Sequence, residues 1–256
     1  MDAEIERSLA YAERLYDAAI GVMATAKVDI QGAWNRDPKI IALSILGRSL
    51  SSFKAALILV RQNQAIEARM LGRSLYENLL WLAALHERKE AFVAEMLEDE
   101  ALNRRSLGQT TMKLTVRHGA DPNAPDGITL RTFIRELART YEDPKKLHAD
   151  KVAEMGKLEL HYVDYTQLSL DSLHCSVTAL GRHISGERES QTRTIVTVNV
   201  EPKTTDKDRL STVLLLCRAM MGAAITVNEM VGFTTASSGV SKAVEEFEKN
   251  GWASRR

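Results

Sequence analysis

The sequence predicts an all-α protein, a multi-helix bundle with one short extended or β segment near residues 194–200. Three observations favour this fold class. Apolar residues recur every three or four positions through most of the chain, which is the period of an amphipathic helix. Only 5% of residues are aromatic, and five prolines in 256 residues leave long stretches without a helix breaker. With 45% hydrophobic residues the chain can bury a sizeable core, and we expect a single helical domain over residues 1–256.

Two helices are expected before residue 62. The first covers residues 3–30 and places its apolar side chains on one face. The second begins at Asp37, whose side chain is suited to cap a helix N-terminus. Pro38 then takes the first helical position, and the apolar pattern continues to about Arg61.

A third helix follows almost at once. Residues 61–64, Arg-Gln-Asn-Gln, interrupt the apolar pattern, and Asn63 is a candidate left-handed C-cap. The third helix then runs to about His86. Because the connection is so short, the two helices should fold back on each other as a core hairpin over about residues 38–88.

The pentapeptide Leu-Gly-Arg-Ser-Leu occurs on both arms of this hairpin, at residues 46–50 and 71–75. Gly47 and Gly72 would allow the two helices to approach closely, with Arg48 and Arg73 near the edge of the contact. Two matches of five residues do not establish an internal duplication. The repeat therefore predicts helix packing.

The second half alternates polar helices with one β-like run. A polar-faced helix after residue 86 should end at Gly119, and Pro, Asp, Asn and Gly mark a loop at residues 120–127. Shorter helices are expected up to about residue 183. The β-like run at 194–200 must pair with a short segment, pair with a second copy of the chain, or cross the bundle unpaired. The most apolar helix is expected at about residues 205–233.

Composition narrows the function classes. Lys+Arg and Asp+Glu number 34 each, so there is no global positive field, and the net charge does not support a nucleic-acid or nucleotide partner. A neutral chain is poorly protected against self-association, which favours a defined oligomer. Two cysteines without a Cys-x-x-Cys motif, and an acidic N-terminus without an apolar signal core, indicate a reduced, cytoplasmic protein. The apolar windows at 40–60 and 213–232 contain charges, which favours buried helices over membrane spans.

Arg73 and Glu77 form the first candidate site, because they stand four residues apart on one helical face in an apolar context. Two interpretations stay open. The pair is either a local ion pair of about 0.3–0.5 kcal/mol or a partly buried pair that lines a pocket between helices. Burial would favour a functional role, because buried ion pairs add little stability relative to apolar replacements.

The second candidate site lies in the stretch 160–183. His161 with Asp164, and Asp171 with His174, each place a carboxylate and an imidazole on one helical face, an arrangement that can raise the basicity of the histidine. The alternative is that these residues are helix caps and core hydrogen bonds, since acids favour a first helical turn. A bundle metal site would need Glu-x-x-His units with further carboxylates, so we expect no metal and no cofactor.

The residues that carry both candidate sites also carry a resemblance. "EARMLGRSLYENLLWLAAL", followed some eighty residues later by "YVDYTQLSLDSLHCSVTALGRHI", resembles the bacterial family known as domain of unknown function 5677 over roughly residues 40–185. The positions that match its motifs are Arg73, Ser74, Leu75 and Glu77, then Tyr165, Ser169 and His174. The spacing from Ser169 to His174 is five residues where the family pattern has four. The resemblance implies a helical fold and gives no activity.

A looser resemblance is to helical ribonuclease domains of prokaryotic toxin and phage-defence systems. Those domains carry an arginine, four to six residues, then a histidine, and no Arg–His pair of this sequence has that spacing. This departure counts against ribonuclease activity by their mechanism. The nucleophile and nucleotide-loop motifs Gly-x-Ser-x-Gly, Gly-x-Gly-x-x-Gly and Walker A are absent as well.

Two hypotheses for function remain. The first is a non-enzymatic helical protein that works as a homo-oligomer, expected as a dimer, or binds a protein partner. The second is a phosphoester or nucleotide hydrolase, for which defence is one setting. In that hydrolase Arg48 and Arg73 would hold phosphate, Glu77 would orient them, and His174 would be the general acid or base. The remaining candidate ligand-binding residues are Tyr165, Ser169 and Asp171.

Overall fold

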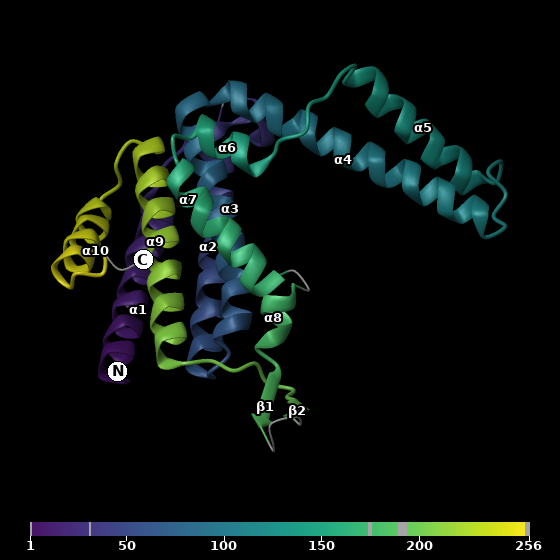
Figure 1. Cartoon of the computed structure of the whole chain (residues 1–256). Helices are drawn as coiled ribbons and strands as arrows, with labels where there is room; N and C mark the ends of the chain where they lie inside the picture. The colour runs from purple at the N-terminus through teal and green to yellow at the C-terminus, as the bar shows by residue number, and fades with distance from the viewer. Residues whose placement is uncertain (1, 31, 174–175, 189–193, 254–256) are drawn as a thin grey trace.

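The computed structural model describes residues 2–30, 32–173, 176–188 and 194–253 and confirms the all-helical fold class (Figure 1). The α-helices of this part of the chain are α1 (Asp2–Thr25), α2 (Pro38–Arg61), α3 (Ala65–Arg88), α4 (Glu90–Arg117), α5 (Pro125–Thr140), α6 (Ala149–Met155), α7 (Glu159–Leu168), α8 (Val177–Gly181), α9 (Asp206–Met230) and α10 (Ser237–Lys249). A 3₁₀ turn, η1 (Trp34–Arg36), precedes α2, and a π-helical turn, η2 (Ser169–Leu173), extends α7.

Four helices make the core of the body. The α2–α3 hairpin is confirmed, and α9 packs against α1, α2 and α3, so that it is central to the bundle. Helix α1 ends at Thr25, five residues before the predicted end, whereas local chemistry sets both ends of α2 where the sequence predicts them. The Asp37 side chain accepts hydrogen bonds from the backbone N–H groups of Lys39 and Ile40, and Asn63 adopts a left-handed backbone with φ of 61°.

The glycines of the repeated pentapeptide do not line the contact between α2 and α3, so that prediction is wrong. A Cβ atom on Gly47 would meet Met23 of α1, and one on Gly72 would meet Leu216 of α9. The hairpin arms are instead joined by a buried hydrogen bond of 3.0 Å from the Asn78 side-chain amide to the Ser49 hydroxyl. Gly47 therefore allows α1 to approach α2, and Gly72 allows α9 to approach α3, because both hairpin helices are buried on more than one side.

The remaining elements of the body cover this core. Helices α6 and α7 pack on α3, and α10 packs on α1. The rings of Tyr11, Phe247 and Trp252 lie 5.3–5.7 Å apart and fasten the C-terminal segment to α1.

The β-like run pairs within the chain. Strand β1 (Ile184–Arg188) and strand β2 (Thr194–Val198) form an antiparallel pair in which Ile184 lies opposite Val198. Of the three arrangements expected for this run, pairing with a short neighbouring segment is the one observed. Several side chains of this ribbon stay exposed, including Val196 and Val198.

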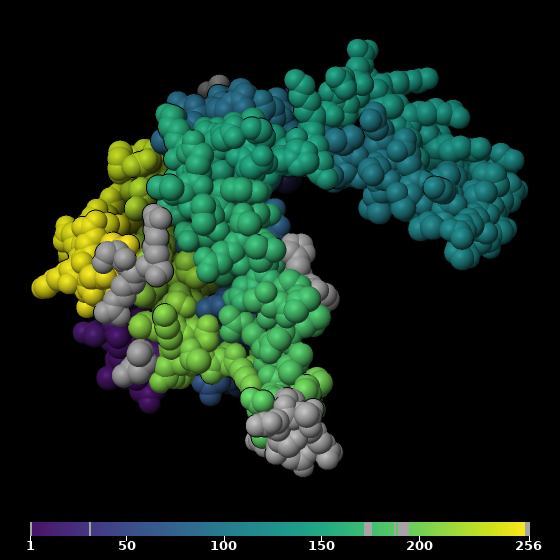
Figure 2. Space-filling view, in the orientation of Figure 1, coloured from purple at the N-terminus to yellow at the C-terminus, as the bar shows by residue number. Residues whose placement is uncertain are grey.

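Helices α4 and α5 form an arm that stands clear of the body (Figures 1 and 2). They pack against each other along a seam where Gly108 of α4 meets Leu130 and Ile134 of α5. Helix α5 begins at Pro125, inside the range predicted as a loop, because proline is suited to the first turn of a helix. Helix α5 has no buried residue.

Helices α2 and α9 are long and apolar enough to cross a membrane, judged by length and composition alone. In this fold, 67% of the most apolar window of α9 is buried inside the protein, against 39% for α2. The apolar character of α9 is thus accounted for largely by its place at the centre of the bundle.

The fold makes a stability prediction at Gly156, which ends α6 against α3. A Cβ atom there would lie 2.7 Å from the Ala83 Cβ and 2.8 Å from the Ala84 backbone nitrogen, which cannot move aside. We expect Gly156→Ala to lower the free energy of unfolding in urea by about 1–3 kcal/mol through overpacking. Gly181→Ala is the control, because a Cβ atom at Gly181 meets nothing within 4 Å. Equal stabilities of the two variants would contradict the close packing of α6 on α3.

Candidate functional site

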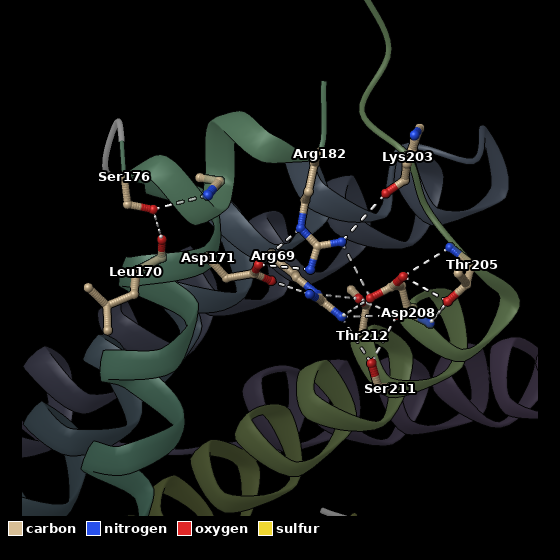
Figure 3. A network of polar contacts seen from close by, with 11 residues as sticks. Arg69, Leu170, Asp171, Ser176, Arg182, Lys203, Thr205, Asp208, Ser211 and Thr212 are labelled. Carbon is tan, nitrogen blue, oxygen red and sulfur yellow. Dashed lines mark hydrogen bonds and ion pairs between the residues drawn. The ribbon is translucent and has the colours of Figure 1, made fainter. Parts of the chain in front are cut away.

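A buried arginine from α3 joins three parts of the chain (Figure 3). The Arg69 side chain is only 9% exposed. Its Nε donates to the Thr212 hydroxyl at 2.9 Å, and its Nη2 donates to the Ser211 hydroxyl at 3.0 Å and to a carboxylate oxygen of Asp208 at 3.2 Å. Its Nη1 donates to the Asp171 carboxylate. The guanidinium therefore ties α3 to η2 and to the first turns of α9.

A second arginine shares the same carboxylates. Arg182, which follows α8, donates from Nε and Nη2 to one oxygen of Asp171 at 3.1 and 2.8 Å. Its Nη1 lies 3.6 Å from Asp208. The Asp171 carboxylate thus lies between two guanidinium groups, and α8 is held against the bundle by charge rather than by an apolar face.

Asp208 also serves the N-terminus of α9. Its second carboxylate oxygen accepts from the Thr205 backbone N–H at 2.9 Å and from the Thr205 hydroxyl at 2.7 Å, completing a capping box. Burial raises the pKa of this carboxyl, but the hydrogen bonds from Thr205 and the charges of Arg69 and Arg182 together outweigh burial. The net result is a pKa below the ordinary aspartate value, so Asp208 is ionised at neutral pH.

The cluster of Arg69, Asp171, Arg182 and Asp208 is electrically balanced, with two guanidinium groups against two carboxylates. All three nitrogens of the Arg69 guanidinium are engaged by protein acceptors. A phosphate entering here would have to displace a carboxylate. The cluster is therefore better suited to holding segments of the chain together than to binding an anion.

The predicted Arg73–Glu77 pair is present one turn further along α3. Arg73 Nη1 donates to Glu77 at 2.6 Å, while its Nη2 donates to the Tyr165 hydroxyl. The guanidinium carbon lies 4.7 Å from the centre of the Tyr165 ring, which stacks on Tyr162. Burial raises the pKa of Tyr165 although Arg73 opposes this, so the hydroxyl stays protonated at neutral pH.

The structure gathers some of the predicted site residues and separates others. Arg73, Glu77 and Tyr165 meet in one cluster, whereas Asp171 bonds to Arg69 and Arg182 instead. The Arg48 side chain is exposed on α2. The Ser169 hydroxyl donates to the backbone carbonyl of Tyr165 within its own helix. His174, the predicted acid or base, lies outside the described residues.

Sequence reasoning missed Arg69 as the centre of the site. Its partners are 102 to 143 residues away along the chain, so no local spacing points to them. A signal was present in the helix pattern, because Arg69, Arg73 and Glu77 recur every four residues on one stripe of an otherwise apolar helix.

A cavity of about 560 Å³ lies beside this network. Apolar side chains from α7 and α9 form part of its wall, including Leu160, Val163 and Leu214. Charged side chains also line it: Glu4, Arg69, Asp164, Asp171, Lys207 and Arg218. Its volume falls in the range of small-molecule sites, about 300–1,000 Å³. Because the polar atoms of Arg69 and Asp171 already bond to one another, the cavity offers mainly apolar contact at this border.

The architecture defines the protein as an all-helical bundle whose inter-helical polar network joins α3, α7–α8 and α9. Residues 39–192, more than half of the chain, match the model of a family of unknown function, DUF5677. The chain therefore belongs to the DUF5677 family. No curated protein and no solved structure matches the chain.

The buried network predicts a large stability effect at Arg69. We expect Arg69→Met to lower the free energy of unfolding by about 3 kcal/mol, because it leaves Asp171 and Asp208 with uncompensated charge in a partly buried setting. Chemical denaturation measured by circular dichroism checks this. Arg48→Met is the matched control and should change stability by at most about 0.5 kcal/mol, since Arg48 is exposed. A similar loss in both variants would contradict the assigned role of Arg69.

The lowered pKa of Asp208 predicts that the stability of the fold depends on pH. Because its pKa is lowered in the folded protein, its stabilising contribution is complete above the ordinary aspartate pKa and is lost as the pH falls through the lower folded value. We expect Asp208→Asn to be less stable than the natural chain at pH about 7, and the gap to narrow on acidification towards pH about 3. Urea unfolding of both proteins at the two pH values measures this. A gap independent of pH would exclude a lowered pKa at Asp208.

Proposed function

We propose that this protein is a non-enzymatic, cytoplasmic component that works as a homodimer, in which a second copy covers one face of the α4–α5 arm. The observation that carries the proposal is the poor burial of the arm. Helix α5 spans 16 residues without a buried side chain, and α4 buries only Gly108 beyond Ala101. An isolated pair of helices with so little buried surface is marginally stable in water, so a covering partner would stabilise it.

One side of the arm offers an apolar surface for such a partner. Helical periodicity, counted from the seam at Gly108, Leu130 and Ile134, places Leu107 and Leu114 of α4 on the same side as Phe133 of α5. These three side chains are 67%, 46% and 38% exposed, respectively. Thr111 and Thr129 lie between them. We call these five residues the apolar face of the arm.

The geometry suits a symmetric pair. An antiparallel helical hairpin with one apolar side can stack on a copy of itself about a two-fold axis, so that the same face is buried on both chains. The product would be a four-helix bundle, in which each hairpin supplies the missing apolar cover of the other.

The hydrolase alternative has less support. It needs arginines free to hold phosphate, yet Arg73 is engaged by Glu77 and Tyr165. Among the described residues, Arg48 is exposed and forms no hydrogen bond or ion pair with that cluster. The cavity beside Arg69 is the observation that favours it, because it has the size of a ligand site. Binding of a small ligand there is compatible with a non-enzymatic dimer.

The dimer is tested by mass measurement in solution. We expect sedimentation equilibrium of the natural chain to give twice the mass of one chain. The double variant Leu107→Glu with Phe133→Glu should weaken the dimer by at least about a hundredfold, because it places four charges in one desolvated interface.

A matched control separates this effect from general charge. Leu180→Glu with Phe233→Glu changes the same residue types at exposed positions of the body. This control should remain dimeric. A natural chain that stays monomeric at all concentrations, or a dimer lost equally in both variants, would contradict the proposal.

A further inference from the structure

The outer part of the arm carries a positive charge that the composition of the whole chain does not reveal. Residues 102–141 contain seven Lys and Arg against three Asp and Glu, a net charge of +4, in a chain whose net charge is zero. The first part of α4, residues 90–101, is acidic instead, with five Asp and Glu and no Lys or Arg. The remainder of the chain is therefore net −4. A positive element that stands clear of an acidic body presents a local field to the solvent (Figure 2).

Six of the seven arm cations form no ion pair within the described part of the chain. They are Arg105, Lys113, Arg117, Arg131, Arg135 and Arg139. The seventh, Arg104, pairs with Glu100 at 2.5 Å. Several arginines outside this segment are paired: Arg14, Arg61 and Arg88, for example, pair with Glu246, Glu13 and Glu95. The positive charge of the arm thus stays available to a partner.

The six unpaired cations lie on one side of the arm. Arg131, Arg135 and Arg139 recur every four residues and form a stripe along α5. Lys113 and Arg117 continue the four-residue spacing of Arg105 along α4. In an antiparallel helix pair, residues displaced in the same rotational sense from the seam fall on the same side of the pair. Counted from Gly108 on α4 and from Leu130 and Ile134 on α5, both stripes are rotated in the same sense about their helix axes. The residues of the apolar face are rotated in the opposite sense, so the two faces lie on opposite sides of the arm. We call these six residues the basic face of the arm.

The basic face differs from a protein interface in composition. Such interfaces have an apolar, aromatic-rich centre that is depleted of charge. Here Leu107, Leu114 and Phe133 lie on the other side. The basic face holds two exposed apolar side chains, Val116 and Ile128, and no aromatic residue. Five of its six cations are arginines, whose planar guanidinium groups bind phosphate oxygens in pairs.

We infer that the basic face binds the phosphate backbone of duplex nucleic acid without regard to sequence. The cations of α4 spread over twelve residues, or about 18 Å at 1.5 Å per residue. A B-form duplex presents one negative charge per about 1.7 Å of axis, so several phosphates fall within reach at once. The face has no aromatic side chain on which successive bases could stack, which favours a duplex over a single strand. The inference is independent of the dimer, because one chain carries the whole face.

The binding is tested by fluorescence anisotropy with a labelled random-sequence DNA duplex and the full-length chain. At physiological salt we expect a dissociation constant in the range of about 10⁻⁴–10⁻⁶ M, and tighter binding at the starting salt of about 50 mM. Raising the salt to about 200 mM should weaken binding by up to about a thousandfold, as expected for as many as six released counterions. The triple variant Arg131→Gln, Arg135→Gln, Arg139→Gln should reduce the slope of log K against log salt by about 3.

The control removes the same charge elsewhere. Arg7→Gln, Arg36→Gln and Lys242→Gln lie on exposed positions of α1, η1 and α10 and should leave the slope unchanged. Far-ultraviolet circular dichroism and a thermal melt establish that both triple variants fold. Undetectable binding at low salt, or equal weakening in both variants, would overturn the inference. So would equal displacement of the DNA by a poly-glutamate chain of matched charge, which would point to an acidic protein as the partner.

Discussion

The fold of the body depends on one buried guanidinium. Arg69 lies on α3 and bonds to Asp171 of η2 and to Asp208, Ser211 and Thr212 at the start of α9. Each N–H donor of a guanidinium at this depth needs an acceptor, because an unpaired buried charge is far more costly than a missing apolar contact. The requirement fixes the first turns of α9 against α3 and holds η2 and Arg182 over them. The small helix α8, which has no buried residue of its own, is placed by the same requirement.

The same balance of charge argues against the phosphate-binding site that was predicted from the sequence. An anion site needs donors that wait for a ligand, and here Arg69, Arg73 and Arg182 each have a carboxylate within the protein. The network is therefore better suited to specifying how helices assemble than to holding phosphate. The neighbouring cavity is shaped by that assembly, since α7 and α9 supply its walls.

The arm is the opposite case, because its charges and apolar groups are not satisfied internally. Its helices contact each other along the seam at Gly108 and contribute little to the main core. The arm therefore has two faces, one apolar and one basic. Within the described chain, neither face is covered by a complementary surface. A dimer through the apolar face would leave the basic face of both chains turned outward, so the two proposals are compatible in one assembly.

The sequence by itself determined the helices and several of their ends. Helical periodicity, the Asp37–Pro38 start, the left-handed Asn63 and the stop at Gly119 are local effects, and the structure bears out each of them. The Arg73–Glu77 pair was predictable for the same reason, because its residues are one turn apart. Tertiary structure alone decided that Gly47 and Gly72 face different helices, that Asp171 belongs to Arg69, and that six scattered cations share one face. Those outcomes depend on which helices become neighbours, and contacts between residues more than a hundred positions apart leave no periodic trace in the chain.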